Sequence, residues 1–206
     1  YYPFEKLPYE FNGDTSANLF NPNEEYKAQE GEYEADIAFL NELLAPIPWL
    51  HTWTLEELIS YPIPYIAKST AAKIKNYAGA IYARELYFDT FSPGPEGTPS
   101  EAVDDALVRT FGSYENFRKE FQDYVHGAYG EGQIWLAVNR DGKVEFFVTR
   151  INEVPPLTEE TPLMGFRTWD QADYLKYRDQ FNQYVASWYR MLNWNKINDR
   201  LLVATS

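Results

Sequence analysis

The 206-residue sequence contains no cysteine and only two histidines, His51 and His126. The lack of cysteine excludes disulfides, zinc–thiolate sites, iron–sulfur clusters and cysteine nucleophiles. Two histidines are too few for a metal site made of three histidines from one chain. No run of 18 apolar residues occurs, so we expect no transmembrane helix.

Positive charge is also scarce. Lys and Arg number 18 against 31 Asp and Glu, which gives a net charge of −13. Contacts with nucleic-acid phosphates depend on Lys and Arg, so this chain is a poor general binder of polyanions. Apolar residues make up 45% of the sequence, which is enough for a hydrophobic core.

The first part of the chain is expected to be an extended arm followed by a helix. Residues 1–23 are rich in Pro, Asn, Gly and aromatics, whereas apolar residues in 24–44 recur every three or four positions. The opposite face of this helix is acidic. We interpret that face as solvated; a divalent-cation site is the alternative, but the spacing fits no EF-hand loop.

Capping residues and prolines mark further helices. Thr54 and Glu57 form a capping box that predicts a helix over 54–60, and a longer helix is predicted over 69–91. The Pro- and Gly-rich segment 92–99 reads as a linker. We therefore divide the chain into a lobe of arm and helical hairpin, 1–92, and a second lobe, 93–206.

The second lobe combines helices with a small sheet. Ser100 and Ser113 are expected to cap two helices. Two β-rich runs, 133–138 and 144–149, are joined through an Asp-Gly turn, and a third strand is predicted over 163–168. Helices follow to about residue 201. The predicted fold class is α+β: an N-terminal helical hairpin, then a three-stranded antiparallel sheet surrounded by helices.

Five sequence blocks in this order resemble the iron/manganese superoxide dismutase family. The residues of the blocks are NYAGAIYARELYF (76–88), FGSYENFRKEF (111–121), YGEGQIWL (129–136), MGFRTWDQADYLKY (164–177) and 188–200. The resemblance implies the same two-lobed fold. It also implies an iron or manganese ion held by three His and one Asp from both lobes.

The resemblance places all four ligand positions on residues other than the expected His and Asp. They fall on Ala28, Arg84, Arg167 and Gln171. A methyl group and two guanidiniums offer no lone pair to a metal, and the two cations would repel it. Three neighbouring positions of the family site fall on Asp36, Gln133 and Asn152. We therefore expect no metal, no cofactor, no catalytic residues and no enzyme activity, and we interpret His51 and His126 as ordinary histidines.

Two arginines in a buried site require compensating charge. An unpaired buried charge costs several kcal/mol. We expect Arg84 and Arg167 to form salt bridges with Asp36 and Asp170 first, and with Glu32 or Glu34 next. The alternative is that the arginines face solvent or a partner.

The dimer interface that the resemblance implies is partly altered. The expected interface residues are Glu32, Tyr129, Glu131, Asp170 and Tyr174. Glu131 replaces a serine that would face its own copy across a two-fold axis, and two like charges repel there. We expect a heterodimer with a related fold, or attachment to other proteins, rather than a symmetric homodimer.

These expectations together predict a non-catalytic structural subunit of a large organellar assembly. The resemblance points to the superoxide dismutase-fold proteins of the mitochondrial ribosomal small subunit, and so to the mitochondrial matrix. Protein subunits are the expected partners, with limited RNA contact through the locally basic segment 167–200 and no membrane insertion. An accessory subunit of a respiratory complex, a small-anion-binding module that uses the emptied pocket, and an enzyme with different chemistry are the alternatives.

Overall fold

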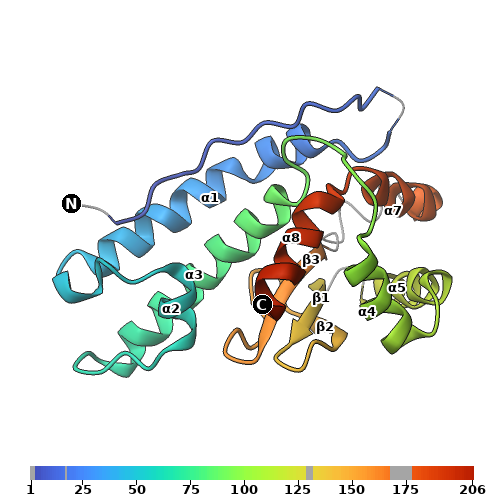
Figure 1. The fold of residues 1–206 in the computed structure, drawn as a ribbon. Coiled ribbons are helices and arrows are strands. Elements are labelled where there is room, and N and C mark those ends of the chain that lie inside the picture. The colour runs from blue at the N-terminus through green and yellow to red at the C-terminus, as the bar shows by residue number, and fades with distance from the viewer. Residues whose placement is uncertain (1–2, 17, 129–131, 168–177) are drawn as a thin grey trace.

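The computed structural model describes residues 3–16, 18–128, 132–167 and 178–206. An extended N-terminal arm runs along helix α1, and α1 packs against α3, while α2 covers one end of α3 (Figure 1). The three helices span Pro22–Leu44, Leu55–Ser60 and Lys68–Asp89. This arrangement is the predicted helical hairpin with its preceding arm.

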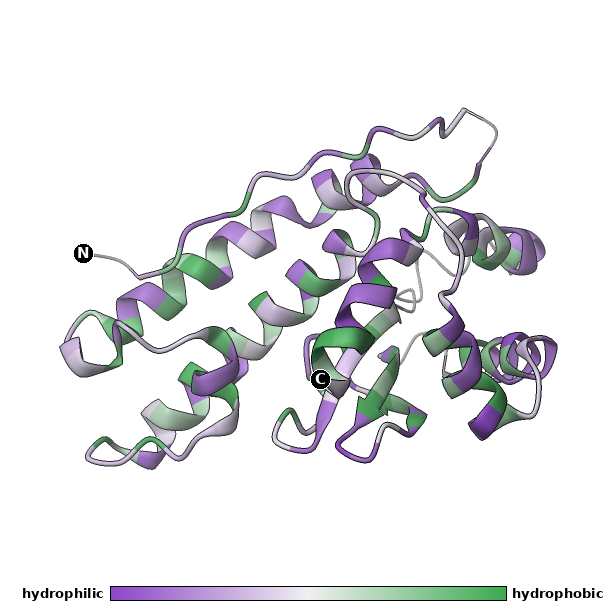
Figure 2. Cartoon of the chain, viewed as in Figure 1, coloured by the Kyte–Doolittle hydropathy of each residue, from purple (hydrophilic) through white to green (hydrophobic). Residues whose placement is uncertain are grey.

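Helix α1 forms because its apolar residues fall on one face. The buried side chains include Tyr33, Ile37, Leu40 and Leu44, at spacings of three and four. Asn21 caps the helix by accepting hydrogen bonds from the backbone N–H groups of the first turn. Figure 2 shows the resulting alternation of hydrophobic and hydrophilic stripes along α1 and α3.

The second half of the chain contains the sheet. Helices α4 and α5 span Glu101–Phe111 and Tyr114–Ala128, and the strands β1, β2 and β3 span Gln133–Asn139, Val144–Thr149 and Glu160–Arg167. The sheet is antiparallel, with β1 between β2 and β3. The predicted α+β fold with a three-stranded antiparallel sheet is therefore confirmed.

Two helices complete the chain. A short 3₁₀ turn at Arg178–Gln180 leads into α7, Phe181–Arg190, which is followed by α8, Trp194–Thr205. Helix α8 packs on β3 and on α4. No helix among the described residues is both long enough and apolar enough to cross a bilayer.

Two hydrophobic clusters form the core. One lies among α1, α2 and α3. The other lies around the sheet, and it also includes Phe11 and Phe20 from the arm, Phe88 from the end of α3, and Phe91 just after that helix. The arm and α3 therefore connect the helical layer to the sheet.

Candidate functional site

Arg84 lies between α3 and α1 with only 2% of its surface exposed. Its Nη2 donates to Glu32 Oε2 at 2.8 Å, and its Nη1 donates to Asp36 Oδ2. Glu32 and Asp36 are four residues apart on α1, so they lie on one face of that helix. The structure thus brings Arg84 together with Asp36 and Glu32, whereas Glu34 pairs with Lys6 on the arm at 2.7 Å.

Arg167 lies at the end of β3 and is also buried, with 8% exposure. Its Nη1 donates to Gln133 Oε1 at 3.2 Å, and its Nη2 donates to Asn152 Oδ1 at 2.7 Å. Gln133 is the residue opposite Arg167 in the β1–β3 register. Among the described residues, Arg167 has amide partners and no salt bridge.

The charges of Arg84 and Arg167 interact electrostatically. Burial above all, together with the nearby charge of Arg84, lowers the pKa of Arg167 to about 10, whereas Tyr87, Glu32 and Glu25 act in the opposite direction. The guanidinium of Arg167 also lies over the ring of Tyr87, 5.9 Å from its centroid. The site therefore holds two cations whose charges influence each other, and the α1 carboxylates of Glu32 and Asp36 hydrogen-bond Arg84.

A surface groove of about 530 Å³ opens beside Arg84. Its walls come from α1, α3 and the loop after β2, and they include Asp36, Tyr77 and Asn152. Asn152 has a positive φ of 67°, which Asn tolerates better than most residues. That turn brings its amide oxygen within hydrogen-bonding distance of Arg167.

The remaining predicted site residues are placed as follows. Ala28 is exposed, on the same face of α1 as Glu32. Residues Tyr129, Glu131, Asp170, Gln171 and Tyr174 lie outside the described residues, so the expected salt bridge of Asp170 and four of the expected interface contacts do too. Glu32, the fifth interface residue, has a side chain that is 75% exposed.

Both histidines contact other parts of the chain. His51 Nε2 lies 2.6 Å from the Leu44 carbonyl oxygen, and His126 Nε2 lies 2.8 Å from Asn182 Oδ1. Neither lies beside Arg84 or Arg167. Within the described parts of the chain, no group of three or more His, Asp or Glu side chains is placed to hold a metal ion.

Comparison with known proteins gives consistent matches. The family model for the C-terminal domain of iron/manganese superoxide dismutases matches residues 99–200. A manganese superoxide dismutase of Leptolyngbya boryana is 30% identical over 81% of this chain and 69% of its own length. The chain belongs to the iron/manganese superoxide dismutase family.

Other relatives in this family agree. A manganese superoxide dismutase of Listeria monocytogenes is 28% identical over 97% of this chain and 96% of its own length. An iron superoxide dismutase of Bacteroides fragilis is 34% identical over 66% of this chain and 71% of its own length. The family that the sequence motifs suggested is thereby confirmed.

The expectation that the chain is not an enzyme is wrong. It was inferred from the replaced ligand positions alone, whereas the relatives are all named as superoxide dismutases, which are enzymes. The replaced residues show which donor atoms the inferred site contains, but they do not measure the activity of the protein.

The residues at three of the four inferred ligand positions do not fit an iron or manganese ion. Such ions take imidazole, carboxylate or water ligands. Ala28 has no donor atom, and the guanidiniums of Arg84 and Arg167 have donors of hydrogen bonds but no lone pair to offer. Arg84 also has both its Nη atoms occupied by carboxylates that could otherwise serve as ligands.

Several residues of this site were not anticipated from the sequence. Gln133 and Asn152 were identified only as neighbouring positions, not as partners of Arg167. The signal for Gln133 was available, because β1 and β3 pair antiparallel and their end residues face each other. Tyr33 donates to Glu85 Oε2 at 2.5 Å next to Arg84, and nothing in the local sequence marks that pair.

Proposed function

We propose that this protein is a structural subunit of a larger protein assembly in an organelle, with the mitochondrial small ribosomal subunit as the first candidate. The observation that carries the proposal is the double ion pair of buried Arg84 with Glu32 and Asp36. It joins α3 to α1 at positions where the resemblance places a metal centre. A role that depends on the shape of the fold requires such a connection and requires no metal there.

Exposed aromatic residues support a protein partner. At the end of the helical layer, Trp49, Tyr61 and Tyr65 have 44%, 50% and 96% of their surface exposed. Trp53 joins them, with its ring centroid 5.9 Å from that of Trp49 and 6.0 Å from that of Tyr61. Aromatic side chains are enriched in the buried centres of protein–protein interfaces.

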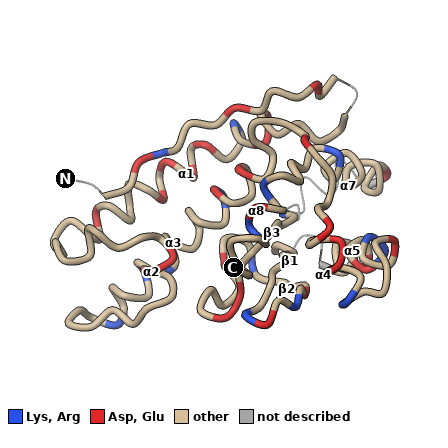
Figure 3. The backbone as a smooth tube through the Cα atoms, viewed as in Figure 1, with Lys and Arg blue, Asp and Glu red and all other residues tan. Residues whose placement is uncertain are grey.

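The charge distribution favours protein over RNA as the main partner. Acidic residues are spread over α1, the arm and the turns of both halves (Figure 3). In the locally basic segment, Arg200 and Lys196 pair with Asp89 at 2.9 and 3.2 Å. Cations that are neutralised internally contribute little to binding phosphates.

We also propose that the partner in the assembly includes a second chain of related fold. The support is the acidic Glu131 at the position that the family resemblance places on the two-fold axis. A different chain can place a cation or a neutral residue opposite that carboxylate, whereas an identical copy cannot.

Co-purification tests the proposal directly. The tagged chain, expressed in its own organism, is purified at physiological salt, and the material is separated on a sucrose gradient and identified by mass spectrometry. We expect it to sediment with small-subunit ribosomal proteins. Co-sedimentation with respiratory subunits would favour the alternative assembly, and sedimentation as a free chain would overturn the structural role.

Superoxide dismutation is the second candidate, and family membership favours it. The relatives from Leptolyngbya, Listeria and Bacteroides carry that activity in their names. The test is to measure superoxide consumption and metal content of the purified chain beside the Listeria enzyme. Activity that rises in proportion to bound iron or manganese would establish this candidate.

A further inference from the structure

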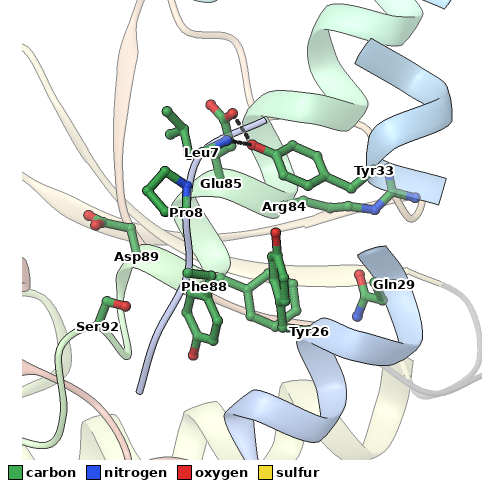
Figure 4. Close-up of a pocket in the computed structure, with 11 residues that line it drawn as sticks. Leu7, Pro8, Tyr26, Gln29, Tyr33, Arg84, Glu85, Phe88, Asp89 and Ser92 are labelled. Carbon is green, nitrogen blue, oxygen red and sulfur yellow. Dashed lines mark hydrogen bonds between the residues drawn. The ribbon is translucent and has the colours of Figure 1, made fainter. Parts of the chain in front are cut away.

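A partly open cavity of about 130 Å³ lies beside Arg84 (Figure 4). Its walls come from the N-terminal arm, α1 and α3. A single water needs only about 10–15 Å³ by this kind of measure. The cavity therefore has room for a small organic molecule.

Three buried polar atoms of the lining residues have no hydrogen-bond partner in the structure: Arg84 Nε, Gln29 Oε1 and Tyr9 Oη. Buried polar groups in folded proteins are almost always satisfied. Only 2% of the surface of Arg84 is exposed, so bulk water does not hydrogen-bond its Nε–H. Gln29 and Arg84 both line the cavity, so its wall offers an unused hydrogen-bond donor and an unused acceptor (Figure 4).

Two of the charged residues around the cavity, Arg84 and Asp89, form ion pairs within the chain. The Nη atoms of Arg84 bind Glu32 and Asp36. The Glu85 carboxyl accepts from Tyr33, and burial raises its pKa. Asp89 pairs with Arg200 and Lys196, so no ion in the cavity is needed to balance Arg84 or Asp89. A neutral occupant fits this balance.

Aromatic rings form the rest of the wall. Tyr9 and Tyr26 are stacked with centroids 4.7 Å apart, and Phe88 lies edge-on to Tyr26 at 5.4 Å. Flat apolar surfaces of this kind favour a flat ring.

We propose that the cavity binds a small, uncharged aromatic carboxamide. The amide oxygen accepts from Arg84 Nε–H, the amide nitrogen donates to Gln29 Oε1, and the ring lies against Tyr26 and Phe88. The site shares Arg84 with the ion pairs that carry the structural proposal, whereas Gln29, Tyr26 and Phe88 belong neither to those ion pairs nor to the inferred ligand positions.

Benzamide is the probe for the test, with the full chain labelled with ¹⁵N. We expect saturable binding with a Kd on the order of 1 mM, because a ligand of this size has few atoms to contribute. The Nε–H resonance of Arg84 should shift on binding. Benzoate and benzamidine, which have the same ring but carry charge, should bind at least fivefold more weakly.

A pair of matched variants separates the site from general effects. Gln29→Leu removes the acceptor at nearly constant volume and should weaken benzamide binding at least fivefold, while Gln122→Leu on α5 should leave it unchanged. Circular dichroism checks that both variants fold. No saturation by about 20 mM benzamide, equal binding by Gln29→Leu and the parent chain, or binding of a charged analogue as tight as that of benzamide would each overturn the proposal.

Discussion

The buried cation of Arg84 is stabilised by two carboxylates that differ in solvent exposure. Its side chain is 3% exposed, whereas the side chains of Asp36 and Glu32 are 19% and 75% exposed. An ion pair in a shielded environment is screened little, and breaking it leaves a charge without compensation. Asp36 should therefore contribute much more to stability than Glu32, although both hydrogen-bond the same guanidinium.

Asp36→Asn is predicted to lower the free energy of unfolding by about 2–3 kcal/mol, because it leaves the Arg84 charge buried with only a solvent-exposed partner. Glu32→Gln should cost less than about 1 kcal/mol. Urea unfolding at pH 7 measures both. Glu34→Gln, in the exposed pair with Lys6, is the control and should behave like Glu32→Gln. Equal losses for Asp36→Asn and Glu34→Gln would contradict the assignment.

Glu160 is a buried carboxyl that the sequence did not single out. It is 7% exposed, and its Oε2 has no partner in the structure. Burial raises the pKa of Glu160 to about 7, with a further contribution from hydrogen bonding and charge repulsion by Glu145 and from the charge of Glu159. The alternating pattern of a strand could have indicated its inward direction, but an acidic residue at a strand end is ordinarily assigned to solvent.

The raised pKa of Glu160 predicts a pH-dependent stability. The folded state holds this proton more tightly than the unfolded chain, so the stabilisation is complete below about pH 4.5 and is lost as pH rises through 7. Glu160→Gln should remove that dependence and raise stability at pH 8 by about 1–2 kcal/mol. Urea unfolding from pH 5 to 8 provides the measurement, with Glu159→Gln as the control. A parallel pH profile for Glu160→Gln and the parent chain would refute it.

At the level of elements, capping residues made the starts of α2, α4 and α5 predictable. The capping box of Thr54 and Glu57 is present, and Ser100 accepts from the Val103 N–H at the start of α4. The third strand was predicted to start at 163 but begins at Glu160. Glu160 and Pro162 make the first residues of this strand resemble a loop in the sequence. Only their pairing with β1 shows that they belong to a strand.

Asn193 connects α8 to the segment after α3. It is 1% exposed, its side chain accepts from the backbone N–H groups of Asn195 and Lys196, and its amide donates to the Ser92 carbonyl. Asn193→Ala is predicted to cost about 2–3 kcal/mol, because it removes both a helix cap and a buried hydrogen bond. Ser100→Ala, which removes a less buried cap, should cost about 1 kcal/mol. Thermal and urea unfolding compare the two, and equal losses would show that the Ser92 contact contributes nothing.

At the scale of the whole molecule, the arm could not be placed from sequence. Its composition predicts an extended segment but not its destination, because nothing local links residue 20 to residue 187. In the structure, Phe20 is fully buried, its backbone N–H donates to Ser187 Oγ at 3.1 Å, and its ring meets that of Phe91. The same limit applies to Asn152, the partner of Arg167 that comes from a loop.

Because Phe20 links the cluster around the sheet to the helical layer, we predict that the helical layer and the sheet unfold together. Phe20 packs with α3 and α7 in the cluster around the sheet, while the α1 that follows it lies in the other cluster. With 5-fluorotryptophan, ¹⁹F NMR follows Trp49 and Trp53 in one part and Trp135 and Trp188 in the other. All resonances should share one urea midpoint, and Phe20→Ala should lower it for all of them, by about 3–4 kcal/mol in unfolding free energy. Separate midpoints, or a shift confined to the tryptophans of one part, would show that the two parts unfold independently.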